Sequence, residues 1–337
     1  MVSIKDIAKE CGVSAATVSK ALNDQPDIGK ATKDLVRKTA AKLGYVVNPS
    51  ARALKTNKTY NIGIVYSGIK PGLAHEYFSV ILENFKNAVE AKGYDITFVN
   101  NDVAGRKGSF LEQCKYRQFD GVAVITADFT DPDIKALCES GIPAVTIDYV
   151  YSSCSSVVSE NAKGMRDLTD YVISKGHRNI AFIHGEDTEV TRNRIMGFTS
   201  ALRDHGLEVN EKYLLSSAYH DADSCYLITR SLLKEEERPS CIMFPDDYSY
   251  MGGLRAIIEA GLNIPTDIST VGYDDIGLAK AFRLTTYNQD SVTIGRLAGE
   301  KLIKEIEDPE SYKEHSVVIG KVVERWTVRD IREQKQD

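Results

Sequence analysis

Five acidic side chains stand at the ends of predicted apolar strands, the position where parallel sheets commonly bind ligands. Each carboxylate can accept hydrogen bonds from hydroxyl groups, and Arg194 can supply the opposite set of donors. Three aromatic residues can stack on a flat face of the same ligand. The residues are Asp148, Asp246, Asp247, Asp274 and Asp275 among the acids, and Tyr77, Phe78 and Tyr219 among the aromatics. Together they predict recognition of a sugar or a nucleoside. For any single one of these Asp residues, capping of the following helix is the simpler explanation.

The sequence does not predict catalysis. It contains no GxGxxG, P-loop, HExxH or GxSxG motif. The six cysteines lie far apart without a CxxC pair, which indicates reduced side chains and neither a disulfide framework nor a zinc site. His177, in "KGHRNI", is better placed to hold a loop than to act as a base. The six histidines show no metal-ligand spacing: His75, His177, His184, His205, His220 and His315. We therefore expect no enzyme activity, no cofactor and no metal.

The charge of the chain is unevenly distributed. Residues 1–60 hold 11 Lys and Arg against 5 Asp and Glu, a net charge of +6, and the rest hold 31 against 43, a net charge of −12. A basic N-terminal segment predicts contact with a polyanion, which the acidic remainder would repel. No apolar run reaches the roughly 18 residues of a membrane helix. The sequence "MVSIKDIAKE" lacks the apolar core of a secretory signal, so we expect a cytoplasmic protein.

The basic segment predicts three short helices. Ser3 and Asp6 have the spacing of a capping box at the start of the first helix. Gly12 ends that helix, and Ser14 caps the second. A third helix is predicted near residues 30–43. The residues expected to face inward are Ile4, Ile7, Ala8 and Cys11 in the first helix, Val18, Ala21 and Leu22 in the second, and Leu35, Val36, Ala40 and Leu43 in the third.

The second helix carries a face of small and polar residues. In "GVSAATVSKALN", residues 12–23, the outward side chains are Ala15, Ala16, Thr17, Ser19 and Lys20. Two helices joined by a turn with Gly form the helix-turn-helix pattern. Small side chains let the backbone approach phosphates and base edges in the major groove, and Lys20 can donate to guanine O6 and N7. The alternative is a three-helix packing module whose polar face only meets water.

A second candidate device for DNA binding follows in "YVVNPSARALKTNKT". Asn48 is a natural N-cap and Pro49 suits the first helical position, which predicts a short helix over about residues 49–55. A helix of this length is not stable alone in water. Leu54 would be an exposed apolar residue on a basic segment, like the wedges that proteins insert between base steps in the minor groove. A loop that packs Leu54 on the rest of the chain explains the spacing equally well.

From Ile62 onward, apolar strands alternate with amphipathic helices, which predicts an α/β fold with parallel sheets covered on both faces. "NIGIVYSG" at residue 61 resembles "NIAFIHGE" at residue 179, and each precedes a helix that ends near a glycine. The repeat predicts two similar lobes with a ligand cleft between them. The strand candidates are "NIGIVYSG", "DITFVNN", "GVAVIT", "PAVTID", "NIAFIHG", "CIMFPDD" and "ISTVGYDD".

Six stretches, taken together and in order, point to a known family. They are "IKDIAKECGVSAATVSKALN", "LGYVVNPSARAL", "KGHRNIAFIHG", "RNRIMGF", "IPTDISTVGYDD" and "LTTYNQD". Through them the chain resembles the LacI/GalR family of bacterial transcription regulators over nearly its whole length. The resemblance implies a homodimer in which each subunit has a helix-turn-helix domain, a hinge helix and a two-lobed effector-binding body like a periplasmic sugar-binding protein.

The resemblance also implies domain limits. They are residues 1–46 for the DNA-binding domain, 47–60 for the hinge helix and linker, and 61–337 for the effector-binding and dimerisation domain. Within the last, lobe 1 is expected at about residues 61–160 and 290–320, and lobe 2 at about 161–289 and 321–337.

The resemblance also implies site residues, each taken from the matching position of the family's motifs. The implied DNA contacts are Ser14, Ala15, Ala16, Thr17, Ser19, Lys20 and Asn23 in the first domain, and Ser50, Ala51, Leu54 and Lys55 in the hinge. The implied effector contacts are Tyr77, Phe78, Asp148, Glu160, Arg194, Tyr219, Asp246 and Asp274. Gln289 falls near the strands that cross between the lobes. Three positions depart from the family pattern: Val47 stands where Pro is frequent, Asp246 where Asn is usual, and Glu160 where Asp is usual.

The implied function is sequence-specific transcriptional repression. A homodimer is expected to bind a palindromic double-stranded DNA operator and to respond to a small polyhydroxylated effector, a sugar. A purine or nucleoside is the alternative effector in the same architecture. A sugar-binding transport protein is the alternative from another class, but it would have no use for the basic N-terminal segment. The tail after Trp326 lacks a leucine heptad, which favours a dimer over a tethered tetramer.

Overall fold

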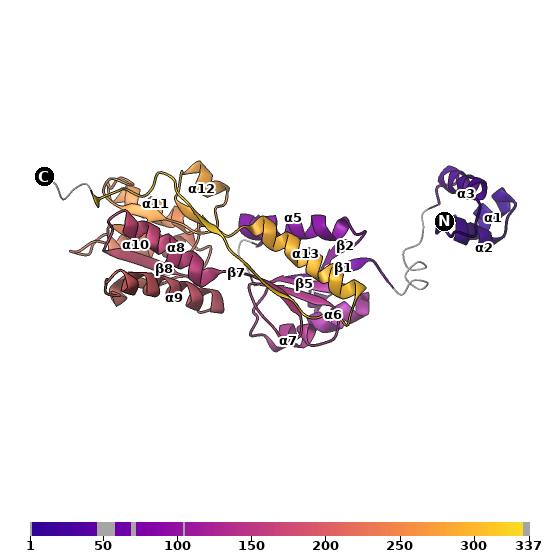
Figure 1. Cartoon of the computed structure of the whole chain (residues 1–337), viewed down its shortest axis with the longest axis horizontal. Helices are drawn as coiled ribbons and strands as arrows, with labels where there is room; N and C mark the ends of the chain where they lie inside the picture. Colours follow the sequence, from indigo (N-terminus) through magenta and orange to yellow (C-terminus); the bar gives the residue numbers. More distant parts are fainter. Residues whose placement is uncertain (1, 46–57, 69–71, 104, 333–337) are drawn as a thin grey trace. The chain divides into compact units, whose positions relative to one another are not determined.

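The computed structural model describes residues 2–45, 58–68, 72–103 and 105–332. The chain divides into two compact units, Met1–Thr59 and Tyr60–Asp337, called here the head and the body (Figure 1). The predicted hinge helix lies outside the described residues, together with its candidate contacts Ser50, Ala51, Leu54 and Lys55. None of the described helices is long and apolar enough to cross a membrane.

The head contains α1 (Ile4–Cys11), α2 (Ala15–Leu22) and α3 (Lys30–Lys42). The predicted capping box of Ser3 and Asp6 is present, and Gly12 ends α1 with a φ of 65°. The Ser14 side chain caps α2 by accepting a hydrogen bond from the backbone of Thr17. The inward-facing side chains of the three helices form one apolar cluster. The helix limits and caps predicted for this segment are therefore confirmed.

The prediction that Leu35 is buried is wrong. Its side chain is 47% exposed, whereas Val36, Thr39 and Ala40 are buried. Successive residues of an α-helix are about 100° apart, so a stripe through Val36 and Ala40 leaves Leu35 on the flank of α3. Thr39, a polar residue that the hydrophobic pattern did not predict to be buried, occupies the inward position instead.

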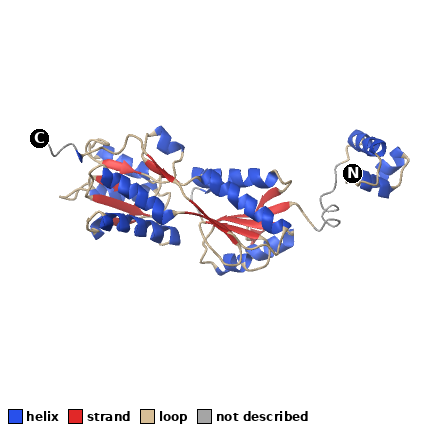
Figure 2. Cartoon of the chain, viewed as in Figure 1, coloured by secondary structure: helices blue, strands red, loops and turns tan. Residues whose placement is uncertain are grey.

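Lobe 1 of the body is a parallel sheet in the order β13-β7-β6-β5-β1-β2. Helices α5 (Glu76–Glu90) and α13 (Ser291–Glu307) cover one face, and α6 (Phe110–Arg117) and α7 (Pro132–Cys138) cover the other (Figure 2). Every residue of β5 is buried, as expected of a strand covered on both faces. The strands are β1 (Asn61–Tyr66), β2 (Asp95–Phe98), β5 (Gly121–Thr126), β6 (Ala144–Ile147), β7 (Ser155–Ser159) and β13 (His315–Val318), beside the short β3 (Asp102–Val103), β4 (Arg106–Lys107) and the 3-10 helix η1 (Gly72–Ala74).

Lobe 2 is a parallel sheet in the order β11-β10-β8-β9. Helices α8 (Asn161–Ser174) and α9 (Glu189–Asp204) cover one face, and α10 (Ala222–Leu232) and α11 (Tyr250–Glu259) cover the other. The remaining elements are β8 (Ile180–His184), β9 (Leu214–Ser216), β10 (Cys241–Met243), β11 (Ser269–Val271), α12 (Gly277–Ala281) and the 3-10 helix η2 (Glu211–Tyr213).

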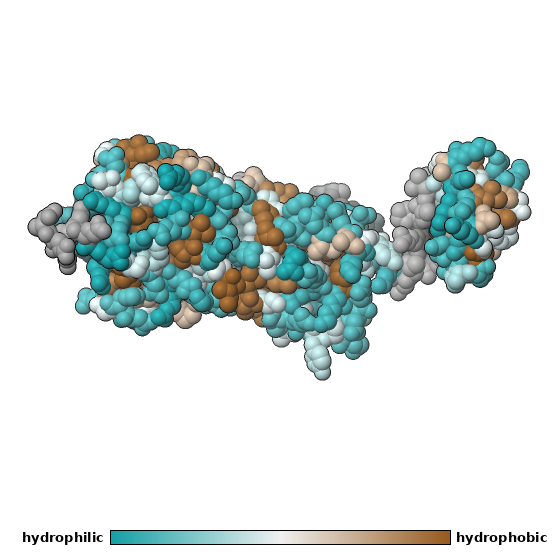
Figure 3. Space-filling model, turned by 45° about the horizontal axis from the view of Figure 1, so that its top comes forward, coloured by the Kyte–Doolittle hydropathy of each residue, from teal (hydrophilic) through white to brown (hydrophobic). Residues whose placement is uncertain are grey.

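The chain crosses between the lobes after β7, after β12 (Thr286–Asn288) and after β13. On its return it forms β14 (Lys321–Val323), which pairs antiparallel with β12. Apolar side chains of the body gather into cores on both faces of each sheet, while hydrophilic residues cover most of the face drawn in Figure 3. The predicted strands are all present, and the α/β fold with two parallel-sheet lobes is confirmed.

Candidate functional site

The exposed face of α2 carries small and polar side chains. Val18 and Ala21 are buried against the other two helices, which turns the intervening residues outward. At the start of the helix, Ser14 Oγ lies 2.8 Å from Thr17 Oγ1 and accepts a 3.0 Å hydrogen bond from the Thr17 N–H. A helix start of this kind can approach a phosphate or a base edge closely. The exposed or half-exposed residues of the face are Ser14, Ala15, Ala16, Thr17, Ser19 and Lys20.

Two polar side chains of this face have partners within the head. Lys20 Nζ lies 2.5 Å from Asp27 Oδ2, and both side chains are about half exposed, at 51% and 52%. Asn23 Nδ2 donates to the Ser19 carbonyl at 2.6 Å. Exposed ion pairs are weak, so Lys20 can exchange Asp27 for a DNA group.

In the body, Arg194 on α9 is a buried charge between the lobes. It is 5% exposed, and it donates through Nε to Asn161 Oδ1 at 2.8 Å and through Nη1 to the Pro245 carbonyl at 3.0 Å. Its guanidinium carbon lies 3.8 Å from the ring centroid of Tyr273. Gly197 lets α9 pack closely against α8, because a Cβ at this position would collide with the backbone of α8.

Carboxylates from both lobes interact with Arg194. Asp148 follows β6 of lobe 1, and Asp274 follows β11 of lobe 2. Burial raises the pKa of both carboxyls, and the charge of Arg194 partly offsets this rise. Tyr77 Oη donates to Asp148 Oδ2 at 3.5 Å, and Gln289 Nε2 donates to Asp274 Oδ1 at 2.5 Å.

The backbone is strained at the same two acids. Asp148 has a φ of 59° and Asp274 a φ of 109°, values that residues with a side chain seldom adopt. Such strain costs on the order of 1–3 kcal/mol per residue and concentrates at ligand-binding sites. Asp275 and Asp290 also have positive φ, so the interaction of Asp148 and Asp274 with the buried Arg194 is what marks the carboxyl ends of β6 and β11 as the candidate effector site.

Two other predicted acids hold local structure. Asp246 accepts hydrogen bonds from the Ser249 N–H at 2.7 Å, from Ser249 Oγ at 2.8 Å and from the His220 N–H at 2.8 Å. Burial raises the pKa of Asp246, but these contacts and the neighbouring His220 side chain together lower it to about 2. Glu160 is the N-cap of α8 and accepts a 3.5 Å hydrogen bond from the Lys163 N–H.

The three predicted aromatic residues lie in different environments. Tyr77 is 4% exposed and belongs to the core of lobe 1, so that only its hydroxyl reaches the acids. Phe78 is half-buried and contacts Tyr77 edge-on, with 5.0 Å between the ring centroids. Tyr219 Oη lies 2.9 Å from Thr191 Oγ1, and the Arg194 guanidinium lies 5.4 Å from the Tyr219 ring centroid. The ring of Tyr219 is thus already engaged with a cation.

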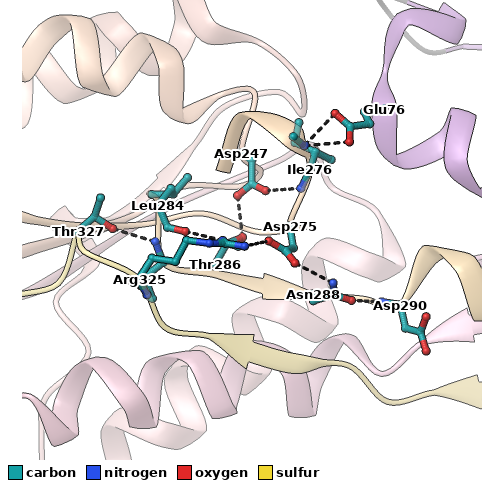
Figure 4. A network of polar contacts seen from close by, with 12 residues as sticks. Glu76, Asp247, Asp275, Ile276, Leu284, Thr286, Asn288, Asp290, Arg325 and Thr327 are labelled. Atoms are coloured by element: carbon teal, nitrogen blue, oxygen red, sulfur yellow. Dashed lines mark hydrogen bonds and ion pairs between the residues drawn. The ribbon is translucent and has the colours of Figure 1, made fainter. Parts of the chain in front are cut away.

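Asp247 and Asp275, which also end predicted strands, belong to a structural network (Figure 4). The Asp247 carboxylate accepts hydrogen bonds from the Ile276 N–H at 3.0 Å and from Thr286 Oγ1 at 2.7 Å. Asp275 forms a 2.5 Å ion pair with Arg325. These contacts tie the loop after β11 to the strands that cross between the lobes.

Two contacts join the lobes at the start of α5. The Gly277 N–H of lobe 2 donates to the carboxylate of Glu76 of lobe 1 at 2.9 and 2.8 Å from its two oxygens. The ring centroids of His75, in lobe 1, and His220, in lobe 2, lie 3.6 Å apart. The sequence pattern did not single out this pair, because the two histidines lie far apart in the chain and only the fold brings them together.

Comparisons with known proteins agree with this architecture. The model of "Bacterial regulatory proteins, lacI family" matches residues 3–48, and that of "Periplasmic binding protein-like domain" matches residues 169–328. The HTH-type transcriptional repressor PurR of Pectobacterium carotovorum subsp. carotovorum is 31% identical over 340 residues, which cover 98% of each chain. The chain belongs to the LacI family. Another relative, the probable HTH-type transcriptional repressor ExuR of Bacillus subtilis, is 30% identical over 98% of this chain and 99% of its own.

Solved LacI-family structures share the fold over nearly the whole chain. The Lac repressor bound to ONPG in its repressed state has a TM-score of 0.81 and 25% identity, with 97% of this chain and 99% of that chain covered. The complex of the regulator CelR with cellobiose has a TM-score of 0.71 and 25% identity, with 97% and 100% covered. As a LacI-family member the chain is a DNA-binding transcriptional regulator and not an enzyme, as predicted.

The structure gathers most, but not all, of the residues that the LacI-family resemblance implies for the effector. Tyr77, Asp148, Arg194, Tyr219 and Asp274 influence one another electrostatically. Phe78 and Asp246 lie beside this group, because both contact His220, the residue that follows Tyr219 in the chain. Among the described residues, no hydrogen bond, ion pair or ring contact links the Glu160 side chain to this group. The sequence did not predict an effector role for Asn161 or His220, and Gln289 was placed only near the crossing strands. The available signal was that Asn161 follows Glu160 and His220 follows Tyr219 in the chain.

Proposed function

We propose that this LacI-family chain is a cytoplasmic repressor that binds a palindromic operator as a homodimer, and that a sugar bound between the lobes sets its affinity for the operator. The observation that carries the effector assignment is the buried Arg194 with Asp148 of lobe 1 and Asp274 of lobe 2 around it. Sugar hydroxyls can donate to both carboxylates and accept from the guanidinium. One polyhydroxylated molecule can therefore bind both lobes at once.

A solved relative supports the sugar assignment. The CelR regulator, which is 25% identical over 97% of this chain, was solved in complex with cellobiose. In the present chain the Tyr219 ring already holds the Arg194 cation, and Tyr77 presents only its hydroxyl to the acids. The polar groups, more than the ring faces, are thus available to a ligand.

A purine or nucleoside is the second candidate effector. The repressor PurR, at 31% identity over 98% of this chain, supports it by name alone. Phe78 and Tyr219 both lie beside His220, so a flat base that displaced Arg194 from Tyr219 would find aromatic partners.

The DNA assignment rests on the head. Its α2 exposes small residues and Lys20, and a Lac repressor dimer bound to operator, with a TM-score of 0.80 and 25% identity, supports dimeric binding. A two-fold dimer presents two copies of α2, which require two symmetry-related half-sites in the DNA. We propose that Ser50, Ala51, Leu54 and Lys55 contact the minor groove between these half-sites.

The effector proposal is tested by a thermal-shift screen of the full chain against sugars, sugar acids, purine bases and nucleosides. Hits are then titrated calorimetrically into the wild type and into Arg194→Lys, which keeps the charge but loses the forked donor geometry. A hydrogen bond to a charged group contributes about 1.5–3 kcal/mol, so we expect a roughly 10- to 100-fold weaker affinity. Arg203→Lys, on the exposed part of the same helix, is the matched control. Stabilisation by purines alone would select the second candidate, and equal affinities of the two variants would reject the site.

A further inference from the structure

Three potential metal ligands from three separate segments meet where the lobes touch. His75 precedes α5 in lobe 1, His220 precedes α10 in lobe 2, and Asp246 lies between β10 and α11 in lobe 2. One ligand atom from each residue lies within 4.8 Å of the others. Two imidazoles and a carboxylate are a donor set of the kind found in zinc sites with an open fourth position.

The imidazoles have unmet bonding capacity. His75 is 2% exposed, and among the described residues neither of its ring nitrogens has a hydrogen-bond partner. Nδ1 of His220, whose side chain is 9% exposed, makes no hydrogen bond either, although it lies 3.5 Å from Asp246 Oδ2. A buried polar atom without a partner costs about 1–3 kcal/mol, so an arrangement with three such atoms together needs an explanation. A metal ion would use a lone pair of each ring.

Hydrogen-bond donors already surround the third proposed ligand, Asp246. The hydrogen bonds from Ser249 and from the His220 backbone already fix the Asp246 carboxylate. Supporting hydrogen bonds of this type orient ligands in metal sites.

We propose that His75, His220 and Asp246 bind a zinc-type divalent transition-metal ion that links lobe 1 to lobe 2. With metal–ligand bonds of about 2.0–2.1 Å, tetrahedral geometry places the ligand atoms roughly 3.3 Å apart. The ligand atoms of the three residues lie within 4.8 Å of one another, so they must move closer together, and the two imidazole rings must turn so that each points one nitrogen at the ion. Imidazole ligands favour zinc-type ions over Mg²⁺ and Ca²⁺, which prefer sites made of oxygen. The fourth position is left for water or for an oxygen of a bound ligand. The proposal does not depend on the effector being a sugar.

The test begins with the full chain, from which a chelator has removed all metal. Zn²⁺ is titrated into this protein calorimetrically, and the zinc content of the loaded protein is measured by mass spectrometry. We expect about one zinc ion per chain, and at least tenfold weaker binding in His75→Phe and in His220→Phe. Both substitutions keep a ring in the contact. Asp246→Asn removes the charge and keeps one oxygen, which can still accept the hydrogen bond of the Ser249 N–H, and it should weaken zinc binding as well.

Controls separate this site from ordinary surface binding. His205→Asn replaces an exposed histidine that pairs with Asp170, and it should leave the zinc affinity unchanged. Unfolding curves in metal-free buffer establish that each variant is folded. Absence of saturable zinc binding by the wild type would overturn the proposal. So would an affinity that survives in folded His75→Phe and His220→Phe, or one that His205→Asn reduces equally. Failure of the sugar screen would leave these outcomes unchanged.

Discussion

The hydrogen bond between Glu76 and Gly277 offers a direct way to change the contact between the lobes. Glu76 is exposed, and its carboxylate accepts the Gly277 N–H across the two lobes. A hydrogen bond to a charged acceptor contributes about 1.5–3 kcal/mol when water is excluded. Exposure reduces this to about 1 kcal/mol. Removal of the acceptor in Glu76→Ala should therefore raise the ratio of separated to joined lobes about fivefold.

Gly277→Ala disturbs the same contact in the opposite manner, by adding atoms. A Cβ at Gly277 would lie 2.9 Å from Glu76 Oε2, so the Glu76 carboxylate must shift and its hydrogen bond to the Gly277 N–H weakens. Glu76→Gln keeps an acceptor oxygen without the charge and should give an intermediate result. Glu83→Ala, another exposed acid on α5, is the matched control.

The assay is hydrogen exchange of the segment around Gly277, measured by mass spectrometry on the full chain without ligand. We expect about fivefold faster exchange in Glu76→Ala, since exchange follows the population of the open form. Exchange in Glu83→Ala should match the wild type. The reasoning is refuted if Glu76→Ala and Gly277→Ala both exchange at the wild-type rate, because the lobes would then be held together by other contacts.

Three further predictions concern the head, the hinge and stability. Lys20→Ala should cost about 1–3 kcal/mol and relax the base preference at one operator position in competition binding; a uniform loss over all sequences would make Lys20 a phosphate contact. Leu54→Ala should weaken binding to the operator but spare the salt-dependent binding to random DNA, whereas equal losses in both would mean that Leu54 packs on protein. Burial lowers the pKa of His177, so the neutral ring stabilises the fold above the ordinary histidine pKa, and this stabilisation is lost as the pH falls. Urea unfolding between about pH 7 and pH 5 should therefore show a weaker pH dependence for His177→Gln than for the wild type, and parallel curves would contradict this.

Local sequence patterns were sufficient to predict the helices and strands and where they end. The capping box at Ser3 and Asp6, the left-handed Gly12 and the cap at Ser14 each depend on residues within one turn, and each is present. The interpretation of His177 as a loop-holding residue is also confirmed, since its ring nitrogens lie 2.9 Å from Ser240 Oγ and 3.0 Å from the Arg329 carbonyl. The strands were found because buried parallel strands are nearly continuous apolar runs.

Other features required the tertiary structure. β7, with the sequence "SSVVS", is too polar to be recognised as a strand, yet it lies inside the sheet of lobe 1. Strand-end position alone did not separate Asp274, which lies with Arg194, from Asp247, which holds Thr286 and the backbone of Ile276. Which acids lie with Arg194 depends on the twist of each sheet and on the crossing strands, and these follow from packing over the whole body.

In our proposal one molecule binds DNA through its head and a sugar through its body, and the two events are coupled. The most direct test is the affinity of the full chain for an operator selected from random DNA, measured by fluorescence anisotropy with and without the sugar found in the screen. Allosteric coupling typically changes affinity about 5- to 150-fold, so the sugar should change the wild-type affinity by at least about fivefold. Arg194→Lys should bind the operator normally and lose this response. A wild-type affinity that the bound sugar does not change, or a full response in Arg194→Lys, would contradict the account.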